Sequence, residues 1–343
     1  MYNNNIFFKI KSEYENRQKK SHRDFLNRQS EIYSLIPEIK EIDNRISIEG
    51  IKLNKAILQS NNKSNHLKET HLKKIESLKS KKVDLIVNAG YPQNYLEQKH
   101  ICPICKDTGF IKNDSQTQKC SCHQQLLINY LYGESNLNLA ENENFSTFDE
   151  SFYPDTIDEK KYGISISPRE NIRKIKLACT KFLENFNSLE QKNLYFCGPT
   201  GMGKTFMSNC IAAEILKMGK TVLYQTAPML FDAINLHKSS MFKNELYNNS
   251  NYNSILMSDL LIIDDLGIES PTASRYAELL NILNIRQLNN LKRPCKTIIS
   301  TNIDIKKLKD YYGERVTSRI IGNYNLFLFA GDDIRRLKNL KRV

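Results

Sequence analysis

One stretch of the chain has the composition and spacing of a phosphate-binding loop. It reads GPTGMGKT: a glycine, four residues, a second glycine, then lysine and threonine. An apolar strand precedes it and a helix is predicted over Thr205 to Lys217, so loop N–H groups and the helix N-terminus face phosphate oxygens. We expect Lys204 to neutralise the β- and γ-phosphates of ATP and Thr205 to ligate Mg²⁺. The candidate nucleotide-binding residues are Gly198, Pro199, Thr200, Gly201, Met202, Gly203, Lys204 and Thr205.

A second pattern is an apolar strand that ends in two carboxylates. The sequence LLIIDD places Asp264 and Asp265 directly after four aliphatic residues. Buried strands rarely end so acidically without a chemical reason. We predict that Asp264 holds the Mg²⁺ shell and that Asp265 polarises the attacking water.

A third strand, Thr297 to Asn302, ends in polar residues. In a phosphate-binding sheet this strand usually lies between the two already named, so its end faces the γ-phosphate. Asn302 is therefore a candidate for orienting the water. The alternative is that Asn302 or Asp304 caps a helix over Ile305 to Tyr311.

Arginines near the C-terminal end are candidates for contacts with phosphate. Arg315 and Arg319 are four residues apart and share one face of a short predicted helix. An arginine supplied in trans stabilises transition-state charge on a neighbouring subunit's γ-phosphate, and Arg319 is the preferred candidate. Intramolecular ion pairs are the alternative. Arg335 is a candidate second nucleotide sensor, or part of a basic tail that contacts DNA phosphates.

Four of the eight cysteines lie close together in the sequence. Cys102, Cys105, Cys120 and Cys122 have the spacing of a tetrahedral zinc site, and a reducing compartment favours metal over disulfides. His100 or His123 is a possible substitute for one thiolate. The remaining cysteines are predicted to be small buried residues: Cys179, Cys197, Cys210 and Cys295.

The elements that carry these residues divide the chain into four predicted parts. Residues 1–97 are predicted to form antiparallel helices, broken at Gly50 and at residues 61–65. Residues 98–140 are predicted as a zinc-binding module with a connecting helix, and residues 141–170 as a linker. In residues 171–343, strands alternate with helices, which indicates a parallel α/β sheet flanked by helices.

Composition favours a polyanionic partner and argues against a membrane protein. The net charge of +12 suits nucleic acid, although a generally basic proteome is an equal explanation. No run of eighteen apolar residues and no secretory signal are present, so a cytoplasmic location is expected.

These motifs together resemble the DnaC/DnaI helicase-loader family and its relative, the IstB transposition ATPase. The resemblance rests on GPTGMGKT, LLIIDDLG, ISTN and GERVTSRI, and it covers nearly the whole chain. It implies an AAA+ core without a C-terminal lid, preceded by a helical region and a small zinc module, with an arginine finger at Arg319. AAA+ proteins usually have glutamate at the position of Asp265, so hydrolysis is expected to be slow.

The resemblance also implies partners. The segment Ala227 to Ser258 corresponds to an inserted helix that lines a DNA-binding pore in initiator-type AAA+ proteins. Its candidate contacts to a single strand are Phe231, Lys238, Phe242 and Lys243, with both phenylalanines alternatively in the core. Similar loaders grip the helicase through a zinc-containing N-terminal domain.

The sequence therefore predicts a loader that delivers a DnaB-type replicative helicase onto single-stranded DNA, self-associates on that helicase, and uses ATP, Mg²⁺ and Zn²⁺. The alternatives are a transposition helper ATPase, and a non-hydrolysing adaptor that recruits DNA.

Overall fold

The computed structural model describes residues 2–58, 64–113, 116–132, 143–241, 247–269 and 272–340. The chain divides into two compact units, Lys11–Thr108 and Met1–Ile10 together with Gly109–Val343. Among the described residues, no helix is long and apolar enough to cross a membrane.

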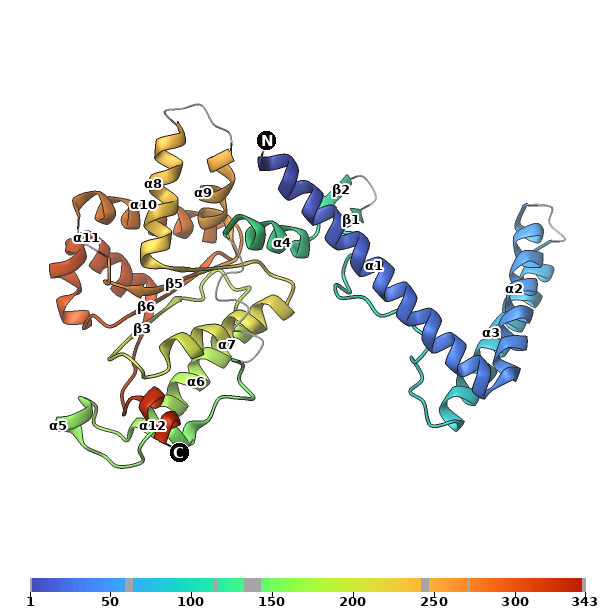
Figure 1. Ribbon diagram of the computed structural model, residues 1–343, viewed down its shortest axis with the longest axis horizontal. Coiled ribbons are helices and arrows are strands. Elements are labelled where there is room, and N and C mark those ends of the chain that lie inside the picture. Colours follow the sequence, from blue (N-terminus) through green and yellow to red (C-terminus); the bar gives the residue numbers. More distant parts are fainter. Residues whose placement is uncertain are drawn as a thin grey trace. The chain divides into compact units, whose positions relative to one another are not determined.

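The unit Lys11–Thr108 is helical, as predicted. It contains most of α1 (Tyr2–Leu35) and all of α2 (Pro37–Leu58) and α3 (Ser64–Asn88). α2 and α3 lie side by side and antiparallel (Figure 1). Glu38 at the start of α2 pairs with Lys81 near the end of α3, and Glu49 farther along α2 pairs with His71 in the first half of α3. Ile32, Ile39 and Ile86 form the buried centre of this unit. The cross-helix ion pairs are Glu38–Lys81, Asp43–Lys82 and Glu49–His71.

The predicted break at Gly50 is wrong, because α2 continues through it. A glycine inside a helix costs about 1 kcal/mol relative to alanine, which packing of α2 against α3 outweighs. Of the second predicted break, residues 61–63 lie outside the described residues, and α3 begins at Ser64.

The second unit is built on a parallel five-stranded sheet. Its strands are β3 (Asn193–Cys197), β4 (Val222–Thr226), β5 (Leu260–Leu266), β6 (Lys296–Thr301) and β7 (Tyr324–Leu328). The order is β4-β5-β6-β3-β7, so β6 lies between β5 and β3 as predicted. The carboxyl ends of parallel strands share one edge, where ligands of open α/β sheets bind. The loops after β3, β5 and β6 therefore meet there.

Helices cover both faces of this sheet (Figure 1). α6 (Pro168–Glu184) and α7 (Lys204–Lys217) pack on one face, and α8 (Ala227–Met241), α9 (Tyr247–Met257), α10 (Ala273–Asn290) and α11 (Leu308–Asn323) pack on the other. The cysteines predicted to be buried are at most 5% exposed: Cys179, Cys197, Cys210 and Cys295. Short elements complete the unit: η2 (Glu150–Phe152), α5 (Glu159–Tyr162), η3 (Ile305–Lys307) and α12 (Ile334–Leu340).

The inserted segment after β4 forms two helices, α8 and α9. Phe231 is 1% exposed and belongs to the core, which confirms the core alternative for Phe231 over stacking on a DNA strand. Lys238 forms an ion pair with Glu278. Phe242 and Lys243 lie outside the described residues.

A small antiparallel hairpin and one helix precede the sheet in the sequence. The hairpin is β1 (Phe110–Asn113) with β2 (Gln116–Lys119), and α4 (Ser121–Tyr132) follows it. The Gln125 side chain of α4 accepts from Val222 N (2.7 Å) and donates to Val222 O (3.0 Å). Because β4 is an edge strand, this amide occupies backbone groups that another strand would otherwise pair.

Candidate nucleotide-binding site and thiol cluster

The phosphate-binding loop follows β3 and leads directly into α7. Gly198 and Gly203 have positive φ of 137° and 86°, which L side chains rarely adopt. A Cβ on Gly198 would lie 2.2 Å from Phe329 O, so only glycine fits there. The loop therefore has the backbone shape that exposes its N–H groups at the start of a helix, which suits an anion.

Lys204 is folded into this loop. Its Nζ donates to Gly198 O (2.7 Å) and Pro199 O (2.8 Å), and the residue is 6% exposed. Burial lowers the pKa of Lys204, and the charges of Asp265 and Asp264 oppose that shift. The ammonium group thus lies in the loop that it is predicted to serve, between carbonyl groups that a phosphate oxygen can replace.

Asp264 lies in the second half of β5, and its carboxylate accepts hydrogen bonds from three hydroxyl groups. Thr205 Oγ1 and Tyr224 OH donate to its Oδ2, and Ser300 Oγ donates to its Oδ1. The residue is 3% exposed. A carboxylate beside a threonine hydroxyl is the donor set that Mg²⁺ takes in phosphate-binding proteins, so Thr205 and Asp264 fit this ion. Tyr224 and Ser300, which contact the carboxylate from β4 and β6, were not predicted from sequence.

Asp265 has a different environment from its neighbour. Its φ is 54°, in the left-handed region, and its side chain is exposed and lines the cavity beside the loop. Its N–H donates to Ser300 Oγ (3.3 Å). Partial burial and the nearby charge of Asp264 raise the pKa of Asp265, against the effects of Lys204 and Arg335. Sparsely populated backbone conformations of this kind cluster at functional sites.

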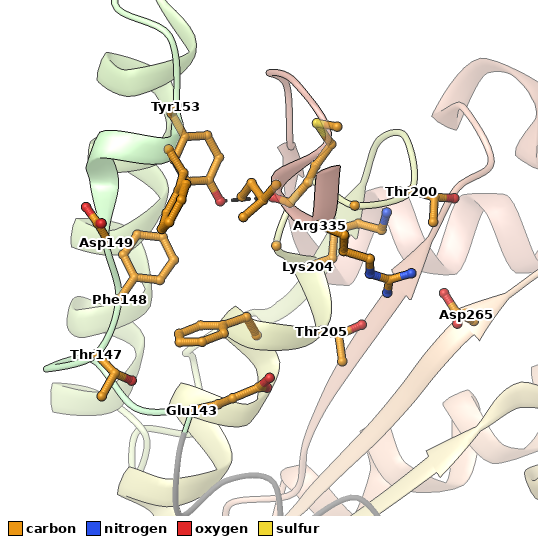
Figure 2. Close-up of a pocket in the computed structure, with 16 residues that line it drawn as sticks. Glu143, Thr147, Phe148, Asp149, Tyr153, Thr200, Lys204, Thr205, Asp265 and Arg335 are labelled. Atoms are coloured by element: carbon orange, nitrogen blue, oxygen red, sulfur yellow. Dashed lines mark hydrogen bonds between the residues drawn. The ribbon is translucent and has the colours of Figure 1, made fainter. Parts of the chain in front are cut away.

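The other candidates are divided between the cavity and the surface. Arg335, near the start of α12, lines the cavity with Lys204 (Figure 2). Asn302 is exposed after β6 and is not among the cavity residues, and Asp304 caps η3. Arg315 and Arg319 are exposed on α11, and neither has an ion pair within the described part of the chain.

The opposite wall of the cavity comes from residues 143–153, which lie in the predicted linker. The Phe148 ring lies 5.7 Å from the Phe206 ring and stacks at 6.1 Å on that of Tyr153. Tyr153 OH donates to Met202 O (2.9 Å) in the phosphate-binding loop. The aromatic-rich sequence FSTFDESFY of residues 145–153 was the available signal. It falls within the predicted linker of residues 141–170, so it was not predicted as part of a site.

The four clustered cysteines come together. The Sγ atoms of Cys102, Cys105, Cys120 and Cys122 all lie within 4.8 Å of one another, and neither His100 nor His123 belongs to this group. All eight cysteines of the chain are thiols. Four sulfurs around a tetrahedral zinc with bonds of about 2.3 Å lie roughly 4 Å apart, so the cluster fits this ion. Asp107 is fully buried, and its carboxylate accepts hydrogen bonds from the Ile101 and Cys102 N–H groups at 2.9 Å. These bonds fix the backbone next to the first pair of cysteines.

Comparison with known proteins gives one family match, and it lies in the second unit. Residues 126–322 match the family of IstB-like ATP binding proteins. The replicative helicase loader DnaC of Escherichia coli K12 is 28% identical over 157 residues, which are 45% of this chain and 60% of DnaC. The protein y4pL of Sinorhizobium fredii, whose name describes an ATP-binding protein of an insertion sequence, is 25% identical over 154 residues. These residues are 43% of this chain and 59% of y4pL.

The chain thus spans about 60% of the length of these curated relatives. Among solved structures, a crystal structure of the DnaC helicase loader matches 56% of this chain and 98% of its own, with 26% identity and a TM-score of 0.43.

Proposed function

The chain belongs to the family of IstB-like ATP binding proteins, and from that premise we propose that it is an ATP-controlled loader of a replicative DNA helicase. The observation that carries this proposal is what lies outside the family match. The helical unit Lys11–Thr108 and the four-thiol cluster, which ends at Cys122, both precede residues 126–322. An ATPase core joined to such a region has one part to bind nucleotide and another to hold a protein partner.

In this proposal the residues at the sheet edge act on ATP as follows. Lys204 exchanges its loop carbonyls for β- and γ-phosphate oxygens, and Arg335 contacts phosphate from α12. Thr205 and Asp264 hold Mg²⁺, which supplies counter-charge to the phosphates. Asp265 accepts a proton from the attacking water, and Asn302 orients that water. Because Asp265 is shorter than glutamate, turnover is slow and the protein behaves as a switch.

The partner assignments extend the same proposal. The helical region binds a DnaB-type helicase, and Cys102, Cys105, Cys120 and Cys122 hold one zinc that stabilises the adjoining hairpin. DNA contacts come from the segment after β4 and from the basic chain as a whole, which carries a net charge of +12. DnaC, the helicase loader that this chain resembles, supports the assignment.

The decisive experiment mixes the protein with the replicative helicase of its host and measures the mass of the complex with and without ATP. We expect a complex whose stability depends on nucleotide, and no such dependence in Lys204→Ala. Lys217→Ala, an exposed lysine on the same helix, is the matched control. A helicase that stays uncomplexed in every nucleotide state contradicts the loader.

Similarity to y4pL supports a second candidate, a helper ATPase of a transposition system. Under that function the ATPase responds to a transposase and to duplex DNA, and the helicase has no effect. A third candidate, a non-hydrolysing adaptor, predicts no turnover with any of these partners. Measuring ATP hydrolysis with helicase and single-stranded DNA, and separately with duplex DNA, distinguishes the three.

A further inference from the structure

The cavity beside the phosphate-binding loop has two chemically different sides. Figure 2 shows Lys204, Thr205 and Arg335 on one side and Glu143 and Phe148 on the other. The first side offers two cations and a hydroxyl group beside the carboxylate of Asp265. The second offers aromatic rings with the carboxylates of Glu143 and Asp149, and that of Asp149 already caps η2. A nucleotide has the matching polarity, since its anionic phosphates and its aromatic base are at opposite ends. The base therefore belongs on the side of Glu143 and Phe148.

The Glu143 carboxylate is held in position by one buried side chain. Glu143 Oε2 accepts from Asn209 Nδ2 at 2.7 Å. Asn209 lies on α7, one turn beyond Thr205, and is 0% exposed. A short bond from a buried amide restricts where the carboxylate can point, so Glu143 presents its second oxygen from a defined place in the cavity wall.

Two acceptors of this pair have no donor among the described residues. No hydrogen bond or ion pair within the described ranges reaches Glu143 Oε1. Asn209 Oδ1 is buried and also lacks a partner in the described part of the chain. A buried amide oxygen without a donor is energetically costly, and such groups are usually satisfied by a ligand or water. Glu143 Oε1 and Asn209 Oδ1 are therefore hydrogen-bond acceptors without donors among the described residues.

We infer that Glu143 makes this site selective for adenine over guanine nucleotides, with Asn209 as the residue that positions it. The inference rests on the proposed nucleotide site. The 6-amino group of adenine carries two N–H donors, which suit an acceptor-only carboxylate. Guanine presents its O6 acceptor at the same position, so its lone pairs face the negative charge of Glu143. Mismatched polar groups in a closed site discriminate more strongly than lost apolar contacts do.

The test compares ADP and GDP, labelled on the ribose, by fluorescence titration of the full chain. We expect the unaltered protein to prefer ADP, and Glu143→Gln to reduce that preference by about tenfold or more. The reduction comes mainly from tighter GDP binding, because the glutamine amide donates to O6 while its oxygen still accepts from Asn209. Glu214→Gln makes the same charge change at a half-buried position of α7, where the carboxylate pairs with Lys217, and leaves the preference unchanged.

Pyrophosphate affinity and thermal unfolding separate this inference from its premise. If Glu143 reads the base, Glu143→Gln keeps both the pyrophosphate affinity and the Tm of the unaltered protein. If ADP and GDP lose affinity equally and the Tm falls, Glu143 is a structural tie to α7 and the inference is wrong. An unchanged ADP to GDP ratio also overturns it. If ADP, GDP and pyrophosphate all fail to bind the unaltered protein, the proposed nucleotide site itself fails.

Discussion

Asp264 and Asp265 are neighbours in sequence with opposite environments. The Asp264 carboxylate is buried and accepts hydrogen bonds from hydroxyl groups. Asp265 has an exposed side chain and a positive φ, and partial burial together with the charge of Asp264 raises its pKa. A residue held this way costs stability in the resting protein, and such costs are common where a side chain is placed for chemistry. The pair therefore combines a carboxylate held by three hydroxyl groups with a neighbour in a sparsely populated backbone conformation.

The first prediction follows for Asp265→Asn. The amide cannot take the proton of water, so hydrolysis should slow while nucleotide affinity is kept. The nucleotide-free protein should become slightly more stable, because the charge beside Asp264 is gone and asparagine tolerates positive φ. A gain of about 0.5 kcal/mol raises the Tm by roughly 1–2 °C, and solvent screening of the exposed carboxyl keeps it small.

The sign of its pH dependence follows from the raised pKa of Asp265. At neutral pH the carboxylate is charged and costs stability. As pH falls through the raised pKa, protonation removes that cost, so the Tm difference between variant and parent should shrink toward zero in acid. Calorimetry from neutral to acidic pH measures this difference. A Tm difference that grows in acid contradicts the predicted pH dependence. Normal turnover of Asp265→Asn would show that Asp265 has no catalytic role.

The second prediction concerns Tyr224, whose hydroxyl donates to Asp264 from β4. Burial raises the pKa of Tyr224, so the group remains a hydrogen-bond donor at physiological pH. Partners of metal-binding carboxylates typically change metal affinity by about 10–100-fold. Tyr224→Phe should therefore need about tenfold more Mg²⁺ for half-maximal strengthening of ADP binding, with Mg²⁺-free ADP affinity unchanged.

Tyr195→Phe is the matched control for Tyr224, because it removes a hydroxyl from another buried strand tyrosine that makes no hydrogen bond to Asp264. Titrating Mg²⁺ against ADP affinity in both variants makes the comparison. Identical Mg²⁺ dependence in Tyr224→Phe and the parent refutes the positioning role.

At the scale of elements, contiguous motifs were predictable and assembled contacts were not. The loop of Gly198 to Thr205 lies between one strand and one helix, so a local pattern suffices to locate it. Tyr224 and Ser300 reach Asp264 from separate strands, and only the register of the sheet brings them together. Phe148 lies in a segment predicted as a linker, and only the folded chain shows that it lines the cavity.

Gly50 illustrates the opposite case, in which a local sequence signal predicted a helix break that the folded chain does not have. Glycine weakens a helix by about 1 kcal/mol, yet the two-helix packing of α2 and α3 carries the helix through it. Tertiary burial outweighed propensity at this position. Phe231 is similar, since an aromatic residue in an inserted helix suits both a core and a DNA contact until its burial is known.

The third prediction concerns the cluster of Cys102, Cys105, Cys120 and Cys122. We expect about one zinc per chain in protein purified without chelator, measured by elemental analysis. Cys120→Ser should lose it, whereas Cys179→Ser, a buried cysteine far along the chain, should keep it. Thiolates bind zinc as anions, so retention should weaken as pH falls.

Nucleotide affinity should survive zinc removal, because no cysteine of the cluster lines the ATP cavity. Less than about half a zinc per chain in the parent protein counts decisively against the site. Loss of zinc together with loss of ADP binding indicates that the cluster supports the whole unit rather than its own hairpin.

At the scale of the whole molecule, Arg319 is the candidate for communication between copies of the chain. It is exposed, and the described residues include no ion-pair partner for it. The fourth prediction is that Arg319→Ala binds ATP as the parent does when monomeric and loses about a thousandfold or more of hydrolysis once assembled on helicase or DNA. Arg315→Ala, one turn away on the same helix, should have a smaller effect.

Mixing Arg319→Ala with Asp265→Asn sharpens this test. Some interfaces in the mixture pair an intact Arg319 with an intact Asp265, so partial recovery of hydrolysis indicates a site shared between subunits. Reduced ATP affinity of the isolated Arg319→Ala chain instead assigns Arg319 to its own subunit, and Arg315 becomes the finger candidate.

The order of strands in the sheet also has a consequence for folding during synthesis on the ribosome. β3 carries the phosphate-binding loop, but its two sheet neighbours are β6 and β7, which follow it by about 100 residues or more. At ribosomal rates of about 5–20 residues per second, β3 waits on the order of 5–20 s for β6. During that time both edges of β3 lack their partner strands, and the nucleotide site at the sheet edge is incomplete. Nucleotide therefore stabilises this sheet only after β6 and β7 have been synthesised.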